Sequence, residues 1–361
     1  MDLSICENGI DEEVNVVQKD VKLVRIFWVD ASGLHRCRII PSRRFDNVVK
    51  KSGFGLSVSC MARPSYGNTP VGSDLTGVGE IRLLPDLSTK RTVPWKEQEE
   101  MVIGDMYIGP GEAWEYCPRE ALRRVSRILK NEFDLEMKAG FEIEFLLLKK
   151  AVKYAMDDVG SGSHVHVSLW QNGKNVLMAA DKSSKHGMST IGEEFMAGVL
   201  HHIPSILPFI APVPNSYDRI QPNTWCGAYQ CWGKDNREAP IRTASPPGIG
   251  VSTVSNFEIK SFDGCANPYL GLAAVLCAGL DGLRNHLQLP QPIDTNPFHM
   301  DFKLQRLPQS LSESLEALDK NNIFTDLMGE RLLVAIKEIR KAEVKYYSEH
   351  HDAYKNLIQH Y

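Results

Sequence analysis

The 361-residue sequence lacks the features that mark three large classes of protein. Its eight cysteines form no C-x-x-C pair and no regular spacing, so we predict reduced thiols and no disulfide framework. The most apolar stretches, 200–213 and 270–283, are interrupted by histidine, proline or aspartate and fall short of a membrane span. The net charge of −4 includes no basic excess of the kind that a sequence-independent nucleic-acid binder needs. These absences leave small-molecule chemistry as the expected function.

The first 20 residues have neither the apolar core of a secretory signal nor the arginines of a transit peptide. They are acidic and show no hydrophobic periodicity, so we predict a disordered lead over 1–20. We expect a cytoplasmic protein that has no nucleic-acid partner and no membrane partner.

The length of the chain favours two domains, each with its own core. The sequence VKLVRIFWVD (21–30) followed by GLHRCRIIP (33–41) predicts two strands joined by a turn at 30–33. A short helix at 43–51, a loop at 59–73 and further strands complete a small β domain over 21–107. A helix with proline near its start begins at 118, and helices near 192–207, 269–286 and 310–361 belong to a second domain over 108–361. The predicted fold class is therefore α+β.

Three segments of the second domain place polar side chains at two-residue spacing. They contain Glu142 and Glu144, then His164, His166 and Ser168, then Glu258 and Lys260. Residues i and i+2 of a strand share a face, so these side chains are expected to face one interior. The apolar residues between and beside them should pack on the outside of the sheet: Phe141, Ile143, Phe145, Val165, Val167, Leu169, Phe257, Ile259 and Phe262. An arginine-rich stretch at 237–242 adds positive charge, and the whole set predicts a metal and nucleotide site.

In their order along the chain, these motifs resemble glutamine synthetase. The segments that carry the resemblance are KAGFEIEF (138–145), GSGSHVHVSLW (160–170), NSYDR (215–219), Asn236 to Arg242, NFEIK (256–260) and NPY (267–269). With WCGAY (225–229) and FDGC (262–265), the pattern is most similar to the glutamine-synthetase-like domain of FluG-type proteins. Several motifs in the same order make a more specific signal than one glycine-rich match.

The resemblance implies a fold, a reaction and an assembly. The fold would be an N-terminal β-grasp domain followed by a catalytic domain with a curved antiparallel sheet and helices. The reaction would be ATP-dependent ligation of ammonia or an organic amine to the side-chain carboxylate of glutamate. ATP would phosphorylate the carboxylate, and the amine would displace phosphate from the acyl phosphate, with Mg or Mn at the phosphates. The chain would form a homo-oligomeric ring, with each site between a catalytic domain and a neighbour's β-grasp domain.

The family's site residues carry over to positions that match its motifs. The implied metal ligands are Glu142, Glu144, His164 and Glu258. The implied nucleotide and phosphate contacts are His166, Ser168, Arg237 and Arg242. The implied substrate contacts are Gly160, Gly162, Arg219 and Trp225. The implied catalytic residues are Arg219, Arg237 and Lys260. Individually, the arginines are equally compatible with ordinary surface charge, and Trp225 with a core position.

The chain departs from the family between the Glu142 and His164 segments. There the family has a long segment with two further glutamates that complete the second metal site, and here that segment is missing near residue 150. Glu144 loses its expected co-ligands, and a single carboxylate holds Mg poorly. The catalytic domain is therefore expected to be incomplete and its activity impaired. The alternative is a noncatalytic, truncated isoform that assembles into mixed rings with full-length relatives. A guanidino kinase is a third class, which the β-grasp domain disfavours.

Two single-residue departures concern the substrate and the rate. Trp225 stands where ammonia-using members have a glutamate that holds and deprotonates ammonium, and its apolar ring suits an organic amine instead. Lys260 stands where the family has arginine, so it keeps the charge and loses bidentate geometry.

Overall fold

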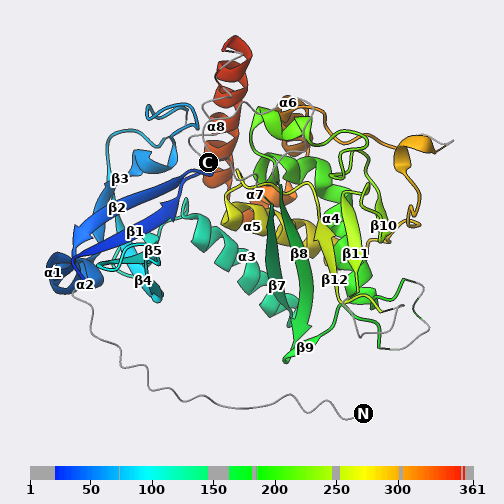
Figure 1. Cartoon of the computed structure of the whole chain (residues 1–361), viewed down its shortest axis with the longest axis horizontal. Helices are drawn as coiled ribbons and strands as arrows, with labels where there is room; N and C mark the ends of the chain where they lie inside the picture. Colours follow the sequence, from blue (N-terminus) through cyan, green and yellow to red (C-terminus); the bar gives the residue numbers. More distant parts are fainter. Residues whose placement is uncertain are drawn as a thin grey trace.

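In the computed structural model, the described residues are 21–72, 74–144, 162–180, 184, 186–245, 253–300, 304–350 and 353. They form two sheets and a set of helices, with α8 (Glu330–Glu349) rising at the top of the view in Figure 1. The predicted disordered lead, Phe145, Gly160 and the junction near residue 150 lie outside the described residues. The α+β fold class is confirmed.

The first sheet has the strand order β2-β1-β5-β4-β3, with β6 paired to β5. Its strands are β1 (Leu23–Val29), β2 (His35–Pro41), β3 (Phe54–Ser57), β4 (Glu80–Thr92), β5 (Glu99–Gly109) and β6 (Glu112–Ala113). Helical turns α1 (Ser42–Arg44), η1 (Phe45–Val49), α2 (Lys50–Ser52) and η2 (Val58–Met61) flank β3. The predicted hairpin is confirmed by the β1–β2 pairing. The sheet extends to Ala113, beyond the boundary at 107, and the domain division stays a prediction.

The hairpin turn is held by the carboxylate of Asp30. Its Oδ1 accepts hydrogen bonds from the backbone N–H of Ser32 at 3.1 Å and of Leu34 at 3.0 Å. Gly33 has φ +100°, and a Cβ there would lie 2.1 Å from the carbonyl oxygen of Cys265. Glycine is therefore required both by the backbone conformation and by the close approach of the second domain.

The second sheet has the order β10-β11-β12-β8-β7, with β9 paired to β8. Its strands are β7 (Glu136–Glu144), β8 (Gly162–Gln171), β9 (Lys174–Asn175), β10 (Trp232–Lys234), β11 (Ile241–Ala244) and β12 (Asn256–Ile259). Within this second sheet, all described pairings are antiparallel except that of β10 with β11, which is parallel. The expectation of an antiparallel sheet therefore needs correction for that one pair.

Two of the described helices contact the second sheet: α3 (Pro118–Phe133) contacts β7, and α4 (Thr190–Ile210) contacts β12. The other helices pack on these two or on one another: α5 (Pro268–Arg284) and α6 (Leu311–Asp319) pack on α4, and α7 (Ile323–Met328) packs on α5. The 3₁₀ turns are η3 (Pro214–Asp218) and η4 (Pro297–His299). α4 and α5 approach so closely that a Cβ on Gly198 would lie 2.2 Å from the carbonyl oxygen of Ala278. Phe195 of α4 meets Phe257 of β12, with ring centroids 6.3 Å apart. Of the helices that the structure describes, none combines the length and apolarity needed to cross a membrane.

The prediction of an apolar outer face is correct for β8 and β12 and wrong at the end of β7. Val165, Val167, Leu169, Phe257, Ile259 and Phe262 are all buried. Ile143 is 68% exposed and Phe141 is 38% exposed, although the Phe141 ring contacts Phe262 edge-on at 5.5 Å. The strand at the edge thus has its apolar face partly open to solvent.

A buried ion pair on α8 connects the C-terminal helix to the loops of the first sheet. Arg340 Nη1 lies 2.6 Å from Glu343 Oε2, and both side chains are buried. Glu343 Oε1 accepts the backbone N–H of Ser65 at 2.8 Å. Arg340 donates to the carbonyl oxygens of Ala31 and Ser32. Because buried charges need partners, these bonds fix the first sheet against the second half of the chain.

Candidate active site

Cross-strand register arranges the polar residues in rows on one face of the second sheet. One row contains Gly140, His166, Glu258 and Arg242 on four successive strands. The next row pairs Glu142 with His164, and the one after it pairs Glu144 with Gly162. Because side chains alternate along a strand, these rows share one face while the apolar residues occupy the other. The sequence prediction that these side chains converge is therefore confirmed.

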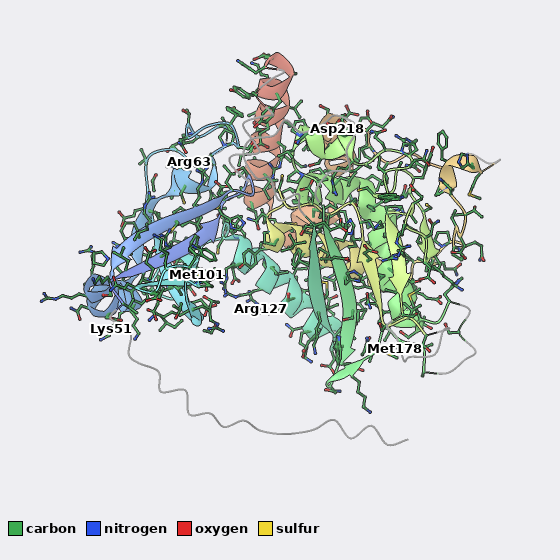
Figure 2. The ribbon with its side chains drawn as sticks, viewed as in Figure 1. Lys51, Arg63, Met101, Arg127, Met178 and Asp218 are labelled. Atoms are coloured by element: carbon green, nitrogen blue, oxygen red, sulfur yellow. The ribbon has the colours of Figure 1, made fainter. Side chains whose placement is uncertain are left out.

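Two residues labelled in Figure 2 help to orient the second sheet. Asp218, at the end of η3, lies above the upper ends of β7 and β8 in this view. Met178 lies at the opposite end, near β9. The row that pairs Glu144 with Gly162 is at the Asp218 end, next to Arg219.

Glu258 is the most enclosed carboxylate of the site, with 1% of its surface exposed. Arg242 binds its Oε2 through Nε at 2.7 Å and Nη2 at 2.6 Å. His164 Nδ1 lies 2.9 Å from Oε1, and Lys260 Nζ lies 3.4 Å from the same oxygen. Burial by itself would raise the pKa of Glu258. The His164 hydrogen bond and the charges of Lys260 and Arg242 outweigh it and lower the pKa to about 2.

Glu142, His166 and Glu258 form a group that can hold a divalent cation. One ligand atom from each of these side chains lies within 4.8 Å of the others. His166 Nδ1 lies 2.8 Å from Asn256 Oδ1, and His166 Nε2 lies 3.2 Å from Glu142 Oε2. In the tautomer whose Nδ1–H donates to Asn256, Nε2 carries a lone pair that faces Glu142 and can bind a metal ion. Two carboxylates and an imidazole suit Mg or Mn, so the residues fit one such ion.

The two histidines of β8, His164 and His166, lie beside different carboxylates. His166 belongs to the three-residue group, whereas His164, the predicted metal ligand, bonds to Glu258 and lies 3.8 Å from Glu144 Oε2. Both rings thus lie beside a carboxylate that was predicted to bind metal. The assignment of the metal to His164 and of nucleotide to His166 stays a prediction.

The Glu144 end of the site is open. The Glu144 side chain is 53% exposed, and the imidazole Nε2 of His164 lies 3.8 Å from its Oε2. In the part of the chain that the structure describes, no second carboxylate joins Glu144 in a three-ligand group. The described residues therefore fit one metal ion and do not complete a second site.

Gly162 marks the point where three of the predicted site residues converge. A Cβ on this glycine would lie 3.0 Å from Glu144 Oε2, 3.1 Å from His164 Nε2 and 3.3 Å from Arg219 Nη1. Arg219 follows η3 and donates through Nη2 to the carbonyl oxygen of Phe262 at 3.3 Å. These distances are tighter than ordinary van der Waals contacts, so a side chain at 162 would push one of these groups away, and glycine allows all three to lie close together.

The remaining predicted contacts are less enclosed. Ser168 lies two residues beyond His166 on the same face, and its Oγ accepts the indole N–H of Trp170 at 2.9 Å. Arg237 is exposed, and no hydrogen bond or ion pair with another described residue is recorded for it. Its phosphate contact stays a prediction.

Trp225 projects into solvent rather than into the core. It is 56% exposed and has φ +60°, a left-handed backbone conformation that is strained for a bulky residue. The interpretation of Trp225 as a core residue is therefore wrong. The preceding Thr224 donates to the carbonyl oxygens of Arg219 and Gln221, the latter at 2.7 Å. These bonds tie the turn that carries Trp225 to the turn that carries Arg219.

Asn256 is a site residue that the sequence reasoning did not assign. It orients the His166 ring, as described above, and its side-chain amide also donates to Ser255 Oγ at 2.9 Å. Its position two residues before Glu258 puts it on the same strand face. The same two-residue spacing that identified the other ligands could have identified it.

Comparisons with known proteins place these observations in a family. Residues 151–357 match the family model described as the glutamine synthetase catalytic domain. The chain is 36% identical over 191 residues to gamma-glutamylpolyamine synthetase GlnA3 of Streptomyces coelicolor, covering 51% of this chain and 41% of that protein. It is 28% identical to Protein fluG of Emericella nidulans, covering 90% of this chain and 47% of that protein. The chain thus spans less than half the length of these two relatives.

Another relative is comparable in extent to this chain. Type-1 glutamine synthetase 1 of Dictyostelium discoideum is 24% identical over 452 residues, covering 94% of this chain and 89% of that protein. An alignment of that length exceeds the 361 residues of this chain, so parts of the relative have no counterpart here. This agrees with the prediction of a missing internal segment.

Solved structures show the same fold. The structure titled "GmaS/ADP complex-Conformation 1" superposes with a TM-score of 0.79 at 19% identity, over 94% of this chain and 97% of that one. The structure titled "Crystal structure of novel glutamine synthase homolog" gives 0.80 at 22% identity, over 93% and 98%. The family-model match spans more than half of the chain, and the chain belongs to the glutamine synthetase family.

Proposed function

We propose that the protein is an ATP-dependent ligase that joins an amine to the side-chain carboxylate of glutamate through an acyl phosphate. The observation that carries the proposal is the convergence of Glu142, His166 and Glu258 on one sheet face, in a chain of this family. A bound Mg or Mn ion would neutralise charge on the phosphates of ATP. We expect these three side chains to hold that ion, with His164 adjacent.

The cations of the site would stabilise the transferring phosphoryl group. Arg242 and Lys260 flank the buried carboxylate of Glu258 and supply positive charge that is already oriented by the protein. Charge that is fixed before the reaction stabilises a transition state without a cost of reorganisation. Lys260 would act as a point charge. Arg237 has no ion pair with another described residue, so its side chain could turn toward the phosphates.

The glutamate substrate would bind near Gly162. Its carboxylate would pair with Arg219, whose Nη1 lies beside Gly162. The half-exposed carboxylate of Glu144 lies beside the same glycine. This arrangement supports a role for the Asp218 end of the sheet in holding the acceptor.

The amine substrate is proposed to be an organic amine rather than ammonia. The exposed Trp225 ring cannot take a proton from ammonium. Its face would attract an alkylammonium group by a cation–π interaction, and the methylene groups of an organic amine would pack against the ring. The strained backbone at Trp225 is of the kind that collects at functional sites. A relative at 36% identity is named as a gamma-glutamylpolyamine synthetase, which supports this choice.

A second candidate is a noncatalytic subunit that assembles with full-length relatives in mixed rings. The observation that favours it is the open Glu144 end, where the described residues supply no second carboxylate. Ring assembly and a cytoplasmic location belong to both candidates and stay predictions.

The test is Mg-ATP-dependent phosphate release by the purified protein with glutamate. Ammonium is compared with mono-, di- and polyamines. Glu258→Ala is compared with Glu97→Ala, a matched change of an exposed glutamate in the turn between β4 and β5. We expect phosphate release that depends on an organic amine, that Glu258→Ala abolishes and that Glu97→Ala leaves unchanged. Trp225→Glu should reduce turnover with the best amine by about tenfold. A folded protein that binds ATP and Mn without any amine-dependent release would contradict the ligase and support the noncatalytic subunit.

A further inference from the structure

β7 is an edge strand with an unusually open surface. It pairs with β8 along all of its nine residues, and no described strand occupies its other side. Every residue of β7 except Met137 is exposed. A Cβ on Gly140, at the midpoint, would meet nothing within 4 Å. A row of backbone donors and acceptors of this length is a template for another strand.

The sequence of β7 is complementary to itself when it is read antiparallel about Gly140. In that register Lys138 faces Glu142 of the other copy, and Met137 faces Ile143. Each of these pairs occurs twice, since the arrangement has two-fold symmetry. The Nζ of Lys138 lies over the Trp170 ring at 3.6 Å, and no ion pair with a described carboxylate competes for its charge. Pairing with Glu142 of the other copy would therefore replace or add to this cation–π contact.

In this register, the polar face of one β7 continues the polar face of the other copy, and the apolar faces also lie on the same side. Even-numbered residues of β7 lie on the polar face and odd-numbered residues on the apolar face, so charge meets opposite charge and Ile143 gains an apolar neighbour. The end pair, Glu136 with Glu144, has like charges. Lys130 Nζ already lies 3.2 Å from Glu136 Oε1 and offsets that repulsion.

Neighbouring registers fit less well. A register centred on Ala139 would put Glu136 opposite Glu142, which repel each other, and would leave Ile143 without a partner on the strand. A register centred on Phe141 would put Lys138 opposite Glu144 but leave Glu136 and Met137 unpaired. The register centred on Gly140 uses the whole strand.

We propose that two copies of this chain associate by antiparallel pairing of their β7 edges about Gly140. The second sheet would then continue across both subunits, and Glu142 of each candidate site would meet Lys138 of the other. The occupant is a second copy because the charges and apolar residues of β7 complement β7 itself. This association does not depend on whether the protein is a ligase.

The first test exchanges the charges of the proposed pair. Lys138→Glu and Glu142→Lys each create two repulsive pairs in a homodimer. Each variant should therefore raise the dissociation constant of the dimer about tenfold or more, as measured by analytical ultracentrifugation. An equimolar mixture of the two variants restores both pairs and should regain wild-type association. Circular dichroism of each variant alone verifies its fold. A wild-type chain that is monomeric, or variants that associate as well as wild type, would overturn the proposal.

The second test locates the two-fold axis by oxidation. Residues that face each other in antiparallel strands have Cα atoms about 4.5–5.5 Å apart, which a disulfide can span. Gly140→Cys should form a covalent dimer, whereas Lys138→Cys alone should do so no more than wild type with its native cysteines. A mixture of Lys138→Cys and Glu142→Cys should cross-link again. Equal cross-linking of Lys138→Cys and Gly140→Cys would contradict the register.

Discussion

The two ends of the candidate site are built differently, although they lie on the same strands. At one end, Glu258 is buried and has cationic or imidazole partners on both of its oxygens. At the other end, Glu144 is half exposed, and His164 at 3.8 Å is its recorded partner. The first carboxylate is held in place by the protein, whereas the second depends on what binds to it. The difference separates a half-site that the described residues enclose from one that they leave open.

This contrast has a physical origin in the register of the strands. Glu258 lies on β12, between β8 and β11, so side chains from both neighbours surround it. Glu144 is the last residue of β7, at the corner of the sheet. No other described strand lies beside β7 on its outer side, and the predicted loss of a family segment after this strand would leave the corner open in the same way.

The largest expected effect is the loss of stability on removing the buried carboxylate. Glu258→Ala leaves Arg242, Lys260 and His164 close together without their counter-charge, and should lower the free energy of unfolding by about 3 kcal/mol or more. Glu144→Ala should change it by less than about 0.5 kcal/mol, as exposed positions do. Urea denaturation of both variants measures the difference. Equal losses would show that the two ends are energetically alike.

The next effect concerns metal binding. Titration with Mn, followed by electron paramagnetic resonance or calorimetry, should show one site per chain. Glu142→Gln should weaken this site by about tenfold or more, because it removes one of two carboxylates. Glu144→Gln should change the affinity by less than about threefold. Two equivalent Mn ions per chain, or a strong effect of Glu144→Gln, would mean that the Glu144 end is complete.

A smaller loss of stability is expected when Arg242 is replaced by lysine, which keeps the positive charge but lacks the planar guanidinium. Arg242→Lys replaces two bonds to Glu258 with one and should cost about 1 kcal/mol in unfolding free energy. Lys90→Arg, at an ion pair of the first sheet, is the reverse exchange and should be nearly neutral. An Arg242→Lys protein as stable as wild type would show that charge alone holds Glu258.

The smallest effect comes from a buried histidine outside the site. Asn321 donates to Nδ1 of His202 at 2.7 Å, and Asp281 lies 2.7 Å from Nε2. Burial lowers the pKa of His202 below its ordinary 6.5 despite the hydrogen bond to Asp281. The unfolded chain then takes up the proton first as pH falls. Stability from neutral His202 is full above pH 6.5 and declines below it, by at most about 1.4 kcal/mol per pH unit.

Thermal melts between pH 7.5 and 5 measure this decline. His202→Gln should flatten the curve relative to wild type, because glutamine has no proton to gain in that range. His286→Gln, at an exposed histidine, serves as the matched control and should leave the slope unchanged. A wild-type slope retained in His202→Gln would assign the decline to other groups.

Much of the fold followed from local patterns in the sequence. The hairpin, the helix that begins at Pro118 and the inward face of β8 depend on turn residues and on periodicity, which are local properties. The rows of the site followed from two-residue spacing. The exposed Ile143 and the solvent-facing Trp225 did not, because exposure depends on which segments cover a residue and not on the residue itself. The choice between two histidines of one strand likewise depends on distances across the sheet.

The ion pair on α8 has a consequence for the order in which the chain is made. Glu343 binds Ser65 across 278 residues, and Arg340 binds Ala31 across 309. The first sheet is therefore synthesised long before the helix that fastens it. During synthesis on the ribosome, the first sheet therefore lacks these bonds until α8 emerges. These contacts between the first sheet and the second half of the chain can form only after that point, so the final step of assembly depends on α8.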